Sequence, residues 1–479
     1  MASCPADRPG KFIVDSIHGA IRLSDRAVRV IDTASFQRLR QLKQLAMAQL
    51  VYPNATHTRF AHSIGTLGIM NRVLEVAADK FNDLNDKQKE NLRLAALLHD
   101  IGHYPYSHMM ESVDKVQLTE KWLEGKILDD SQVEYPPHEE IGRLIVTTQP
   151  DLIEAIGSKE RAETVADLFT RTETTGSQFS KLVHSSLDLD RLDYLLRDSY
   201  ATGVPYGRID IHYLLNMLRV SPSGRVGFLE KALPAVEHFL LARFFMHRAV
   251  YYHKTTYGFE EVCRQLFRRL RGRGGENYGI PVDRKRIEEW VTKPELNTFT
   301  DSFVDKVIQE AAVKDGDKVI QALARSLQTR TPPKLLKEVP ICVEKGTDYH
   351  AGNTFGLNCK NKLRQLAGEF DIPLGQFLLC NVPPITVGEH QQRLTSRQAA
   401  EHRPEDLRDR AAKEEEKDIR VFVADEPEPR SLMEIDHSVV PKFAQYPFQT
   451  FRLYVVYEGK DKDNVIGKLR EKVKYWDKS

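Results

Sequence analysis

Apolar residues recur at intervals of three and four along most of the first two thirds of the chain. The segment 92–98 is typical, and the same periodicity runs through residues 27–169 and again through residues 178–267. This spacing predicts amphipathic helices. Loops between them are predicted where Gly and Pro gather, at positions 136–137, 157–158 and 203–207. The first 335 residues are therefore predicted to be mainly helical.

The pattern changes in the last third of the chain. Short runs of β-branched and aromatic residues at 341–343, 377–382, 419–423 and 451–457 predict strands, and a charged helix is predicted from about Asp463. We expect a mainly α fold with two domains, a helical domain over residues 1–335 and a smaller C-terminal α+β lobe over residues 336–479. Within that lobe, charges of both signs crowd positions 395–418, which predicts a solvated insertion.

Composition narrows the class of protein. Lys and Arg total 69 against 68 for Asp and Glu, so the chain has almost no net charge. Its overall charge therefore does not favour binding to nucleic acid or to a membrane. The five cysteines form no C-x-x-C pair, which argues against a disulfide framework and a thiolate zinc site. The first residues contain no apolar signal segment and no later run is long enough to span a membrane. A cytoplasmic protein without a membrane partner is expected.

One segment gathers an unusual set of polar side chains at the end of an apolar helix. His99 and Asp100 are adjacent, His103 follows, and His108 comes after Pro105. On a continuous helix His99 and His108 would lie on opposite faces, but Gly and Pro stop the helix. The break could fold His108 back over the same site.

Three further predicted helices carry polar groups on one face. They present Arg59 and His62; Asp190, Asp193, Tyr194 and Arg197; and Arg243, His247 and Tyr251. Buried carboxylates need partners or a metal, and imidazole with carboxylate suits Mn, Fe, Ni, Co or Mg better than structural zinc. A lone buried histidine is more often a satisfied core residue, and Asp193 with Arg197 could simply be an ion pair.

The ordered set of His, His-Asp and Asp resembles the HD superfamily of metal-dependent phosphohydrolases. Longer stretches, including VDSIHGAIRL, YPNATHTRFAHSIG, HDIGHYPYSH and LDLDRLDYLLRDS, resemble the deoxynucleoside triphosphate triphosphohydrolases. Within these, the likeness is to the branch containing the sterile-alpha-motif and HD-domain enzyme of vertebrates. Only ten residues precede Lys11, so a prokaryotic-type member without the sterile-alpha-motif domain is expected.

The resemblance implies a role for each matching position. The divalent metal, whose identity among Mn, Fe, Mg, Ni, Co and Zn stays open, would be held by His62, His99, Asp100 and Asp190. The catalytic group would comprise His103, His108, His138 and Glu139. Substrate would be bound by Gln44, Leu45, Arg59, Arg191, Tyr194, Asp198, Arg243, His247 and Tyr251. Position 191 departs from the vertebrate enzyme, where lysine stands, and Gln44 with Leu45 would select deoxyribose.

The resemblance also implies regulation by a nucleotide activator and assembly into a homo-oligomer, a dimer, tetramer or hexamer. Lys11, Asp32, Gln37 and Arg40 match one activator site. Val14 replaces an asparagine that touches the activator in the relative, and the second activator site has no clear basic counterpart near 227–231. A different activator is therefore expected.

The function implied is hydrolysis of a dNTP to deoxynucleoside and inorganic triphosphate, in control of nucleotide pools or in antiviral defence by starving phage. An HD phosphodiesterase or nuclease, acting on cyclic nucleotides or nucleic-acid ends, would need the same metal site. A nucleotide sensor is a third class. An arginine cluster at 264–273 could bind nucleic acid or phosphate, although a basic helix end needs no ligand.

Overall fold

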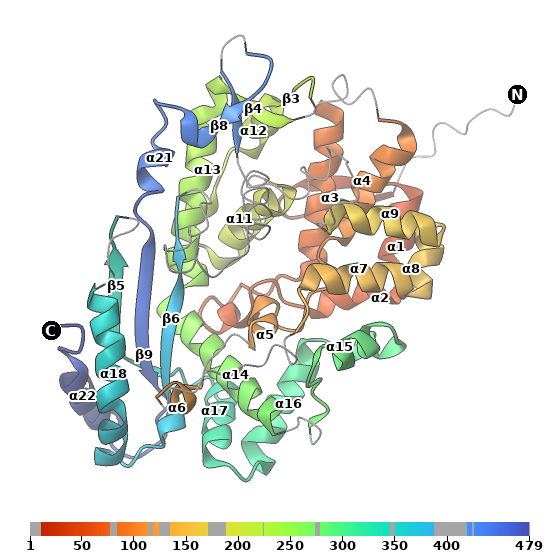
Figure 1. Cartoon of the computed structure of the whole chain (residues 1–479). Coiled ribbons are helices and arrows are strands. Elements are labelled where there is room, and N and C mark those ends of the chain that lie inside the picture. Colours follow the sequence, from red (N-terminus) through yellow and green to blue (C-terminus); the bar gives the residue numbers. More distant parts are fainter. Residues whose placement is uncertain are drawn as a thin grey trace, which may run out of the picture.

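Helices dominate the architecture, which confirms the prediction of a mainly α fold (Figure 1). The structure, a computed structural model, describes residues 11–76, 84–113, 118–123, 135–170, 188–223, 225–273, 278–344, 350–387, 419–423 and 426–478. Among the described helices, none combines the length and the apolar character that crossing a bilayer requires.

Three helices form the frame of the candidate site. The helix α3 (Arg59–Val76) packs against α4 (Asp86–Leu98) and α11 (Leu189–Thr202). The side chains of Asn85 and Gln88 form a reciprocal capping box that fixes the start of α4. The Asp188 side chain accepts from the Arg191 amide and caps α11. The Asp188 cap thus fixes the first turn of α11, which carries Asp190, while His99 and Asp100 follow the C-terminal end of α4.

A second set of helices closes the site from the other side. The helix α13 (Leu233–Met246) passes into one π-helical turn (His247–Tyr251) and then, after His253, into α14 (Lys254–Gly272). Single π turns inside helices often occur at functional sites. The turn brings the His247 and Tyr251 rings to 4.9 Å between centroids.

Further helices connect and cover these elements. They are α1 (Asp25–Ile31), α2 (Ala34–Gln37), α5 (His108–Glu111), α6 (Thr119–Leu123), α7 (His138–Thr148), α8 (Pro150–Ile156), α9 (Lys159–Phe169), α12 (Ile211–Met217), α15 (Arg284–Val291), α16 (Asp301–Lys314), α17 (Lys318–Gln328), α18 (His350–Glu369), α21 (Val440–Phe443) and α22 (Lys462–Val473). Of these, α7 and α9 pack against each other, and α9 also packs on α4.

The described strands form three small sheets. They are the hairpin β1 (Lys11–Asp15) and β2 (Gly19–Leu23); the sheet of β3 (Leu218–Val220), β4 (Val226–Leu229), β7 (Arg420–Phe422) and β8 (Arg430–Ser431); and the antiparallel sheet of β5 (Lys334–Cys342), β9 (Phe448–Val455) and β6 (Phe377–Ile385). The last sheet lies between α14 on one side and α18 and α22 on the other (Figure 1).

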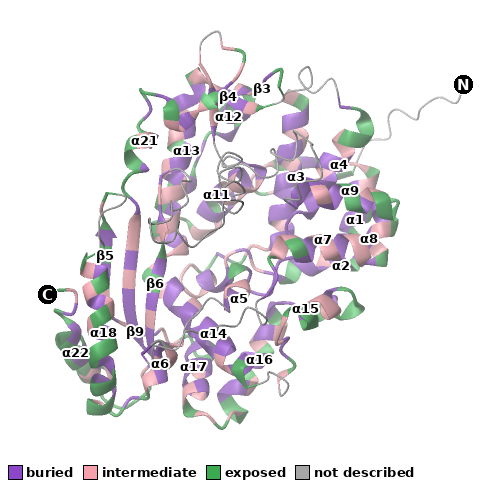
Figure 2. Cartoon of the chain, viewed as in Figure 1, coloured by how far each residue is buried: buried purple, intermediate pink, exposed green. Residues whose placement is uncertain are grey.

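Side-chain alternation explains how this three-stranded sheet is buried on both faces. Leu378 and Tyr454 belong to the main core with the helices, whereas their neighbours Phe377 and Val455 belong to a separate core under α18 and α22. Exposed residues gather on the outer faces of α18 and α22 (Figure 2).

The run at 419–423 forms a strand, but not in the sheet of β5, β9 and β6. It contributes β7, which pairs in parallel with β4 from the helical part of the chain. The last third of the chain therefore supplies strands to two sheets. The domain boundary at 335 stays a prediction, and the charged segment at 395–418 lies outside the described residues.

Candidate metal centre and active site

The structure brings the side chains of all four predicted metal ligands together. His62 Nε2 lies 2.9 Å from Asp190 Oδ1 and 3.5 Å from Asp100 Oδ2. His99 Nε2 lies 3.4 Å from Asp100 Oδ1 and 3.8 Å from Asp190 Oδ1. Nitrogen and oxygen donors from α3, α4 and α11 thus face one another around a common point.

The two histidines are oriented so that one ring nitrogen remains for a metal. His62 Nδ1 donates to Asp193 Oδ2 at 2.7 Å, and His99 Nδ1 donates to the Ala96 carbonyl at 2.9 Å. Both Nε2 atoms are buried and make no hydrogen bond with acceptable geometry among the described residues. Fixing Nδ1 as the donor leaves the Nε2 lone pair for a metal, so the residues fit a divalent ion. His62, His99 and Asp190 form a group that could hold it. The Asp100 carboxylate lies beside this group, 3.5 Å from His62 Nε2 and 3.4 Å from His99 Nε2.

Negative charge around the centre favours a cation. Burial alone would lower the pKa of His62, but the Asp190 and Asp193 carboxylates raise it to about 10. A bound divalent ion would satisfy the same carboxylates in place of that proton.

A buried network supports His62 from behind. Asp193 accepts from Arg197 Nε and Nη2, both at 2.8 Å, and from His18 Nε2 at 2.7 Å. Arg197 also donates to Asp15, at 2.8 and 3.2 Å. The sequence marked Asp193 and Arg197 as a possible ion pair, which they are, but it gave no role to Asp15 or His18. Both residues lie in the VDSIHG stretch, and the family resemblance of that stretch is the sequence feature that could have indicated their role.

A second cluster of imidazoles lies beside the metal centre. The His103 ring stacks on His138 at 3.9 Å between centroids, and His108 lies 4.8 Å from His103. The chain reaches this arrangement through a tight turn in which Tyr106 and Ser107 have φ of 53° and 56°. Such a conformation is rare for bulky residues and is often found at functional sites. The turn folds His108 back over the site, although its catalytic role and that of Glu139 stay predictions.

Glu111 completes this cluster, and sequence reasoning missed it. Its Oε2 atom lies 3.1 Å from His108 Nδ1 and 3.2 Å from His138 Nδ1. Burial would raise the pKa of Glu111, but hydrogen bonds from the two histidines lower it below its usual range. The i,i+3 spacing of Glu111 from His108 is the sequence feature that could have indicated this contact. His103, His108, Glu111 and His138 are a second group that could hold a metal ion.

Both clusters open into one cavity of about 940 Å³. The predicted substrate residues that line it are Gln44, Leu45, Arg59, Arg191, Tyr194, Asp198, His247 and Tyr251, together with Glu139. Arg243 is not among the described residues that line the cavity. Its positive charge nevertheless lowers the pKa of His247, which does line the cavity.

Several predicted substrate residues already have partners. Arg59 is buried, and its Nη1 atom donates to Asp100 Oδ2 at 2.5 Å. Asp198 accepts from His57 at 2.8 Å and from the Tyr251 hydroxyl at 2.7 Å. These contacts order the wall of the cavity next to the metal centre.

The wall around His247 is electropositive. Burial, and then the charges of Arg243 and Arg191, lower the pKa of His247 to about 3. An imidazole kept neutral by burial and by two nearby guanidinium charges indicates a region suited to an anion.

The predicted activator residues lie at the surface. Lys11, Asp32 and Arg40 are exposed, and Arg40 Nε donates to Gln37 Oε1 at 2.7 Å. Val14 is 86% exposed on the β1–β2 hairpin. Their activator role stays a prediction.

Three arginines of the 264–273 cluster pair with different acidic side chains. Arg264 contacts Glu260 and Glu261, Arg269 contacts Glu120, and Arg273 contacts Asp315 and Asp317. This dispersion favours the structural interpretation over a nucleic-acid surface.

Comparison with known proteins places this geometry in a family. The HD domain model matches residues 59–198. The chain is 36% identical over 249 residues to the uncharacterized protein MJ1154 of Methanocaldococcus jannaschii, covering 51% of this chain and 47% of that protein. It is 30% identical over 337 residues to the uncharacterized MG461 homolog of Mycoplasma pneumoniae, covering 68% and 75%.

More distant matches include a named enzyme. The human deoxynucleoside triphosphate triphosphohydrolase SAMHD1 is 27% identical over 346 residues, covering 65% of this chain and 53% of that protein. The crystal structure of the phosphohydrolase BT4208 from Bacteroides thetaiotaomicron has a TM-score of 0.67 at 22% identity, over 93% and 99% of the two chains. The chain thus spans about half the length of several curated relatives, and the solved structure supports the fold alone.

The matched residues 59–198 contain all four candidate ligands, and the Mycoplasma relative is aligned over three quarters of its length. The chain belongs to the HD-domain family.

Proposed function

We propose that this protein is a metal-dependent hydrolase of deoxynucleoside triphosphates, releasing deoxynucleoside and inorganic triphosphate. The observation that carries the proposal is the single cavity into which the metal centre, the imidazole cluster and the electropositive wall all open. HD domains bind divalent metals, and the human relative, a deoxynucleoside triphosphate triphosphohydrolase, supports the choice of substrate.

The metal would be held by His62, His99, Asp100 and Asp190, and when bound it would supply Lewis acidity and an activated water. The chain's own residues would do the rest. Arg191 and His247, with the charge of Arg243 nearby, would hold the phosphates where negative charge develops. Tyr194 and Arg59 line the same wall.

The leaving group is the 5′ oxygen of the nucleoside. Water adds to the α-phosphorus, the bond from phosphorus to the 5′ oxygen breaks, and His108 donates a proton to that oxygen. Glu111 hydrogen-bonds both His108 and His138 and would hold the donor protonated until the bond breaks. His103, His138 and Glu139 would complete this proton-handling group.

The deoxyribose would lie against Gln44 and Leu45. Gln44 is 8% exposed, and its Oε1 atom is buried without a hydrogen-bond partner among the described residues. A buried acceptor left unpaired costs free energy, which a sugar hydroxyl would recover. Leu45 beside it would exclude a 2′ hydroxyl. This orphan oxygen supports the sugar assignment.

Regulation is part of the proposal. We expect a nucleotide activator at Lys11, Asp32, Gln37 and Arg40, and a homo-oligomer whose subunits bring that surface together. The exposed hairpin residues Phe12, 58% exposed, and Val14 support a buried contact in such an assembly. Depletion of dNTP pools, in homeostasis or against phage, would be the cytoplasmic consequence.

Product analysis tests the proposal. Purified protein with Mn²⁺ receives each dNTP singly and in pairs, and the products are resolved by ion-exchange chromatography. Deoxynucleoside with triphosphate is expected, and activity confined to mixtures would reveal the activator. Release of monophosphate or pyrophosphate, or cleavage of cyclic nucleotides or oligonucleotides only, would overturn the proposal in favour of a phosphodiesterase or nuclease. The Asp190→Asn variant, with the same fold by circular dichroism, is the control for a contaminating hydrolase.

A further inference from the structure

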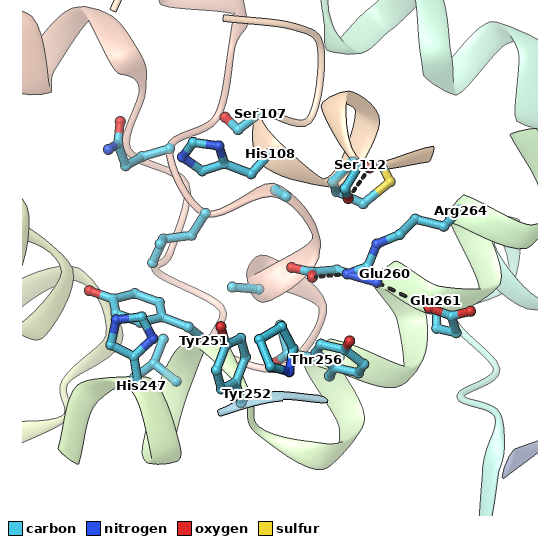
Figure 3. Close-up of a pocket in the computed structure, with 18 of the residues that line it drawn as sticks. Ser107, His108, Ser112, His247, Tyr251, Tyr252, Thr256, Glu260, Glu261 and Arg264 are labelled. Carbon is cyan, nitrogen blue, oxygen red and sulfur yellow. Dashed lines mark hydrogen bonds and ion pairs between the residues drawn. The ribbon is translucent and has the colours of Figure 1, made fainter. Parts of the chain in front are cut away.

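The cavity continues well beyond the metal centre and the residues discussed so far. Its remaining wall is built by α14 on one side and by β6 on the other, where Leu379, Cys380 and Asn381 line it. Figure 3 shows Ser107 and His108 across the space from Tyr251, Tyr252 and Thr256, with Glu260 between them. If phosphates occupy the electropositive wall and His108 faces the 5′ oxygen, this end is where a nucleobase would lie.

A carboxylate with an open oxygen projects into this end. Glu260 Oε2 accepts from Arg264 Nη2 at 2.9 Å, while Arg264 Nη1 donates to Glu261 Oε2 at 3.1 Å. No hydrogen bond to Glu260 Oε1 occurs among the residues that the structure describes. The Glu260 side chain keeps 18% exposure and lines the cavity. Arg264 therefore anchors one oxygen and leaves the other toward the cavity.

The contact with Arg264 does not fully compensate the Glu260 carboxylate for its burial. Burial raises the pKa of Glu260 despite the neighbouring Arg264. A ligand that donates hydrogen bonds to this carboxylate would restore the solvation that burial removes.

A second polar group lies one helical turn away on the same face of α14. Thr256 is 1% exposed, and its hydroxyl oxygen is buried without a partner among the described residues. Thr256 and Glu260 are spaced i,i+4, so their side chains are neighbours along the cavity wall. A hydroxyl that can donate and a carboxylate that can only accept therefore stand side by side.

We propose that Thr256 and Glu260 form a guanine-reading subsite, so that dGTP is the preferred substrate. Guanine presents the complementary edge, since its O6 atom accepts from Thr256 while its N1–H and 2-amino group donate to the Glu260 carboxylate. This inference rests on the proposed function, because it needs a dNTP in the cavity.

The other bases fit the pair less well. Adenine and cytosine each place a ring nitrogen acceptor against the carboxylate beside one amino donor. Thymine offers one N–H between two carbonyl oxygens, and one of those would face the carboxylate. Leaving a polar group of the site unpaired is the main source of discrimination against such analogues.

Equilibrium binding tests the subsite independently of turnover. Isothermal titration calorimetry in EDTA measures the affinity of the full chain for dGTP, dATP, dCTP, dTTP and dITP, which lacks only the 2-amino group. We expect dGTP to bind about 10- to 100-fold more tightly than dATP, dCTP and dTTP, with dITP between. Glu260→Gln should remove both the preference for dGTP over the other bases and the difference between dGTP and dITP.

Two further variants serve as a control and as an independent test of the subsite. Glu261→Gln loses the other carboxylate that pairs with Arg264, and we expect it to retain the preference for guanine. Thr256→Val keeps the shape of the side chain and should weaken dGTP relative to dATP, even if Glu260→Gln fails to fold. Equal affinity of the wild type for all four bases, or an equal loss for every base in Glu260→Gln, would overturn the subsite.

Ion-exchange analysis of products separates this inference from the proposed function. A guanine preference in binding without release of deoxynucleoside and triphosphate would overturn the hydrolase proposal and leave the subsite standing. Triphosphate release from all four dNTPs without a binding preference would overturn the subsite alone.

Discussion

Replacing Asp193 by Asn should weaken metal binding although Asp193 is not a ligand. The Asp193 carboxylate accepts from His62 Nδ1 at 2.7 Å and thereby keeps His62 Nε2 free for the metal. An asparagine keeps one acceptor oxygen but replaces the other by an NH₂ group, which cannot accept a hydrogen bond. The groups that donate to the second oxygen would then lack an acceptor. His62 would lose the partner that fixes its orientation and tautomer.

The size of the effect follows from the role of such outer contacts. Loss of a partner behind a ligating histidine costs about 10- to 100-fold in metal affinity, or about 1.4–2.7 kcal/mol. The fold should also lose stability, because Asp193 is 0% exposed and pairs with Arg197. Asp15 still contacts Arg197 at 2.8 Å, which should limit that loss to about 1–3 kcal/mol.

Asp15→Asn is the matched control. It removes a carboxylate from the same guanidinium group but makes no contact with His62. Mn²⁺ affinity, measured by isothermal titration calorimetry, and unfolding in urea should therefore separate the two variants: both lose stability, and only Asp193→Asn loses metal affinity. Equal metal affinity in Asp193→Asn and the wild type, or an equal loss in both variants, would refute this role.

Three further outcomes are expected. Gly102→Ala should destabilise the protein by about 1–3 kcal/mol in urea unfolding, because the added Cβ would overlap the His138 carbonyl oxygen. Gly368→Ala is the control, since its added Cβ would contact no other atom of the described residues, and it should be neutral or stabilising. Equal effects of the two substitutions would contradict this reasoning. His247, with its pKa lowered from 6.5 to about 3, stays neutral in the fold while the unfolded chain gains a proton below pH 6.5, so stability falls as pH drops. His247→Gln should recover up to about 2 kcal/mol of that loss at pH 5, and an unchanged pH profile would count against it. EDTA should lower the Tm of metal-loaded protein and Mn²⁺ should restore it, but Asp190→Ala should respond to neither.

The resemblance to the HD superfamily indicated the four candidate metal ligands, and these residues stand at the ends or first turns of helices. His99 and Asp100 directly follow α4, and Asp190 occupies the first turn of α11. Local helix rules place such residues well, and a Gly and Pro break explained how His108 could return to the site. The mainly helical class followed from the same periodicity.

Contacts between distant segments could not be predicted in this way. His18 lies 175 positions from Asp193, and nothing in either local pattern indicates their 2.7 Å hydrogen bond. The pairing of β7 with β4 could not be predicted either, because a short β-branched run predicts a strand but does not indicate which strand it pairs with. Glu111 was overlooked because a carboxylate three residues after a histidine is common on exposed helices. Its burial against His138 depends on where α7 packs.

Under the proposed function, the distribution of charge along the cavity would give a bound nucleotide one favourable direction. The wall around His247 is positive through Arg191 and Arg243, whereas the far end presents the open oxygen of Glu260. A reversed nucleotide would place its phosphates against the Glu260 carboxylate, and like charges repel more strongly in a partly buried site than in bulk water. His99, Asp100 and Asp190 line the same cavity as both ends. Charge asymmetry would therefore set the direction of the nucleotide before any base contact forms, and the base contact would then add selectivity to an orientation already set.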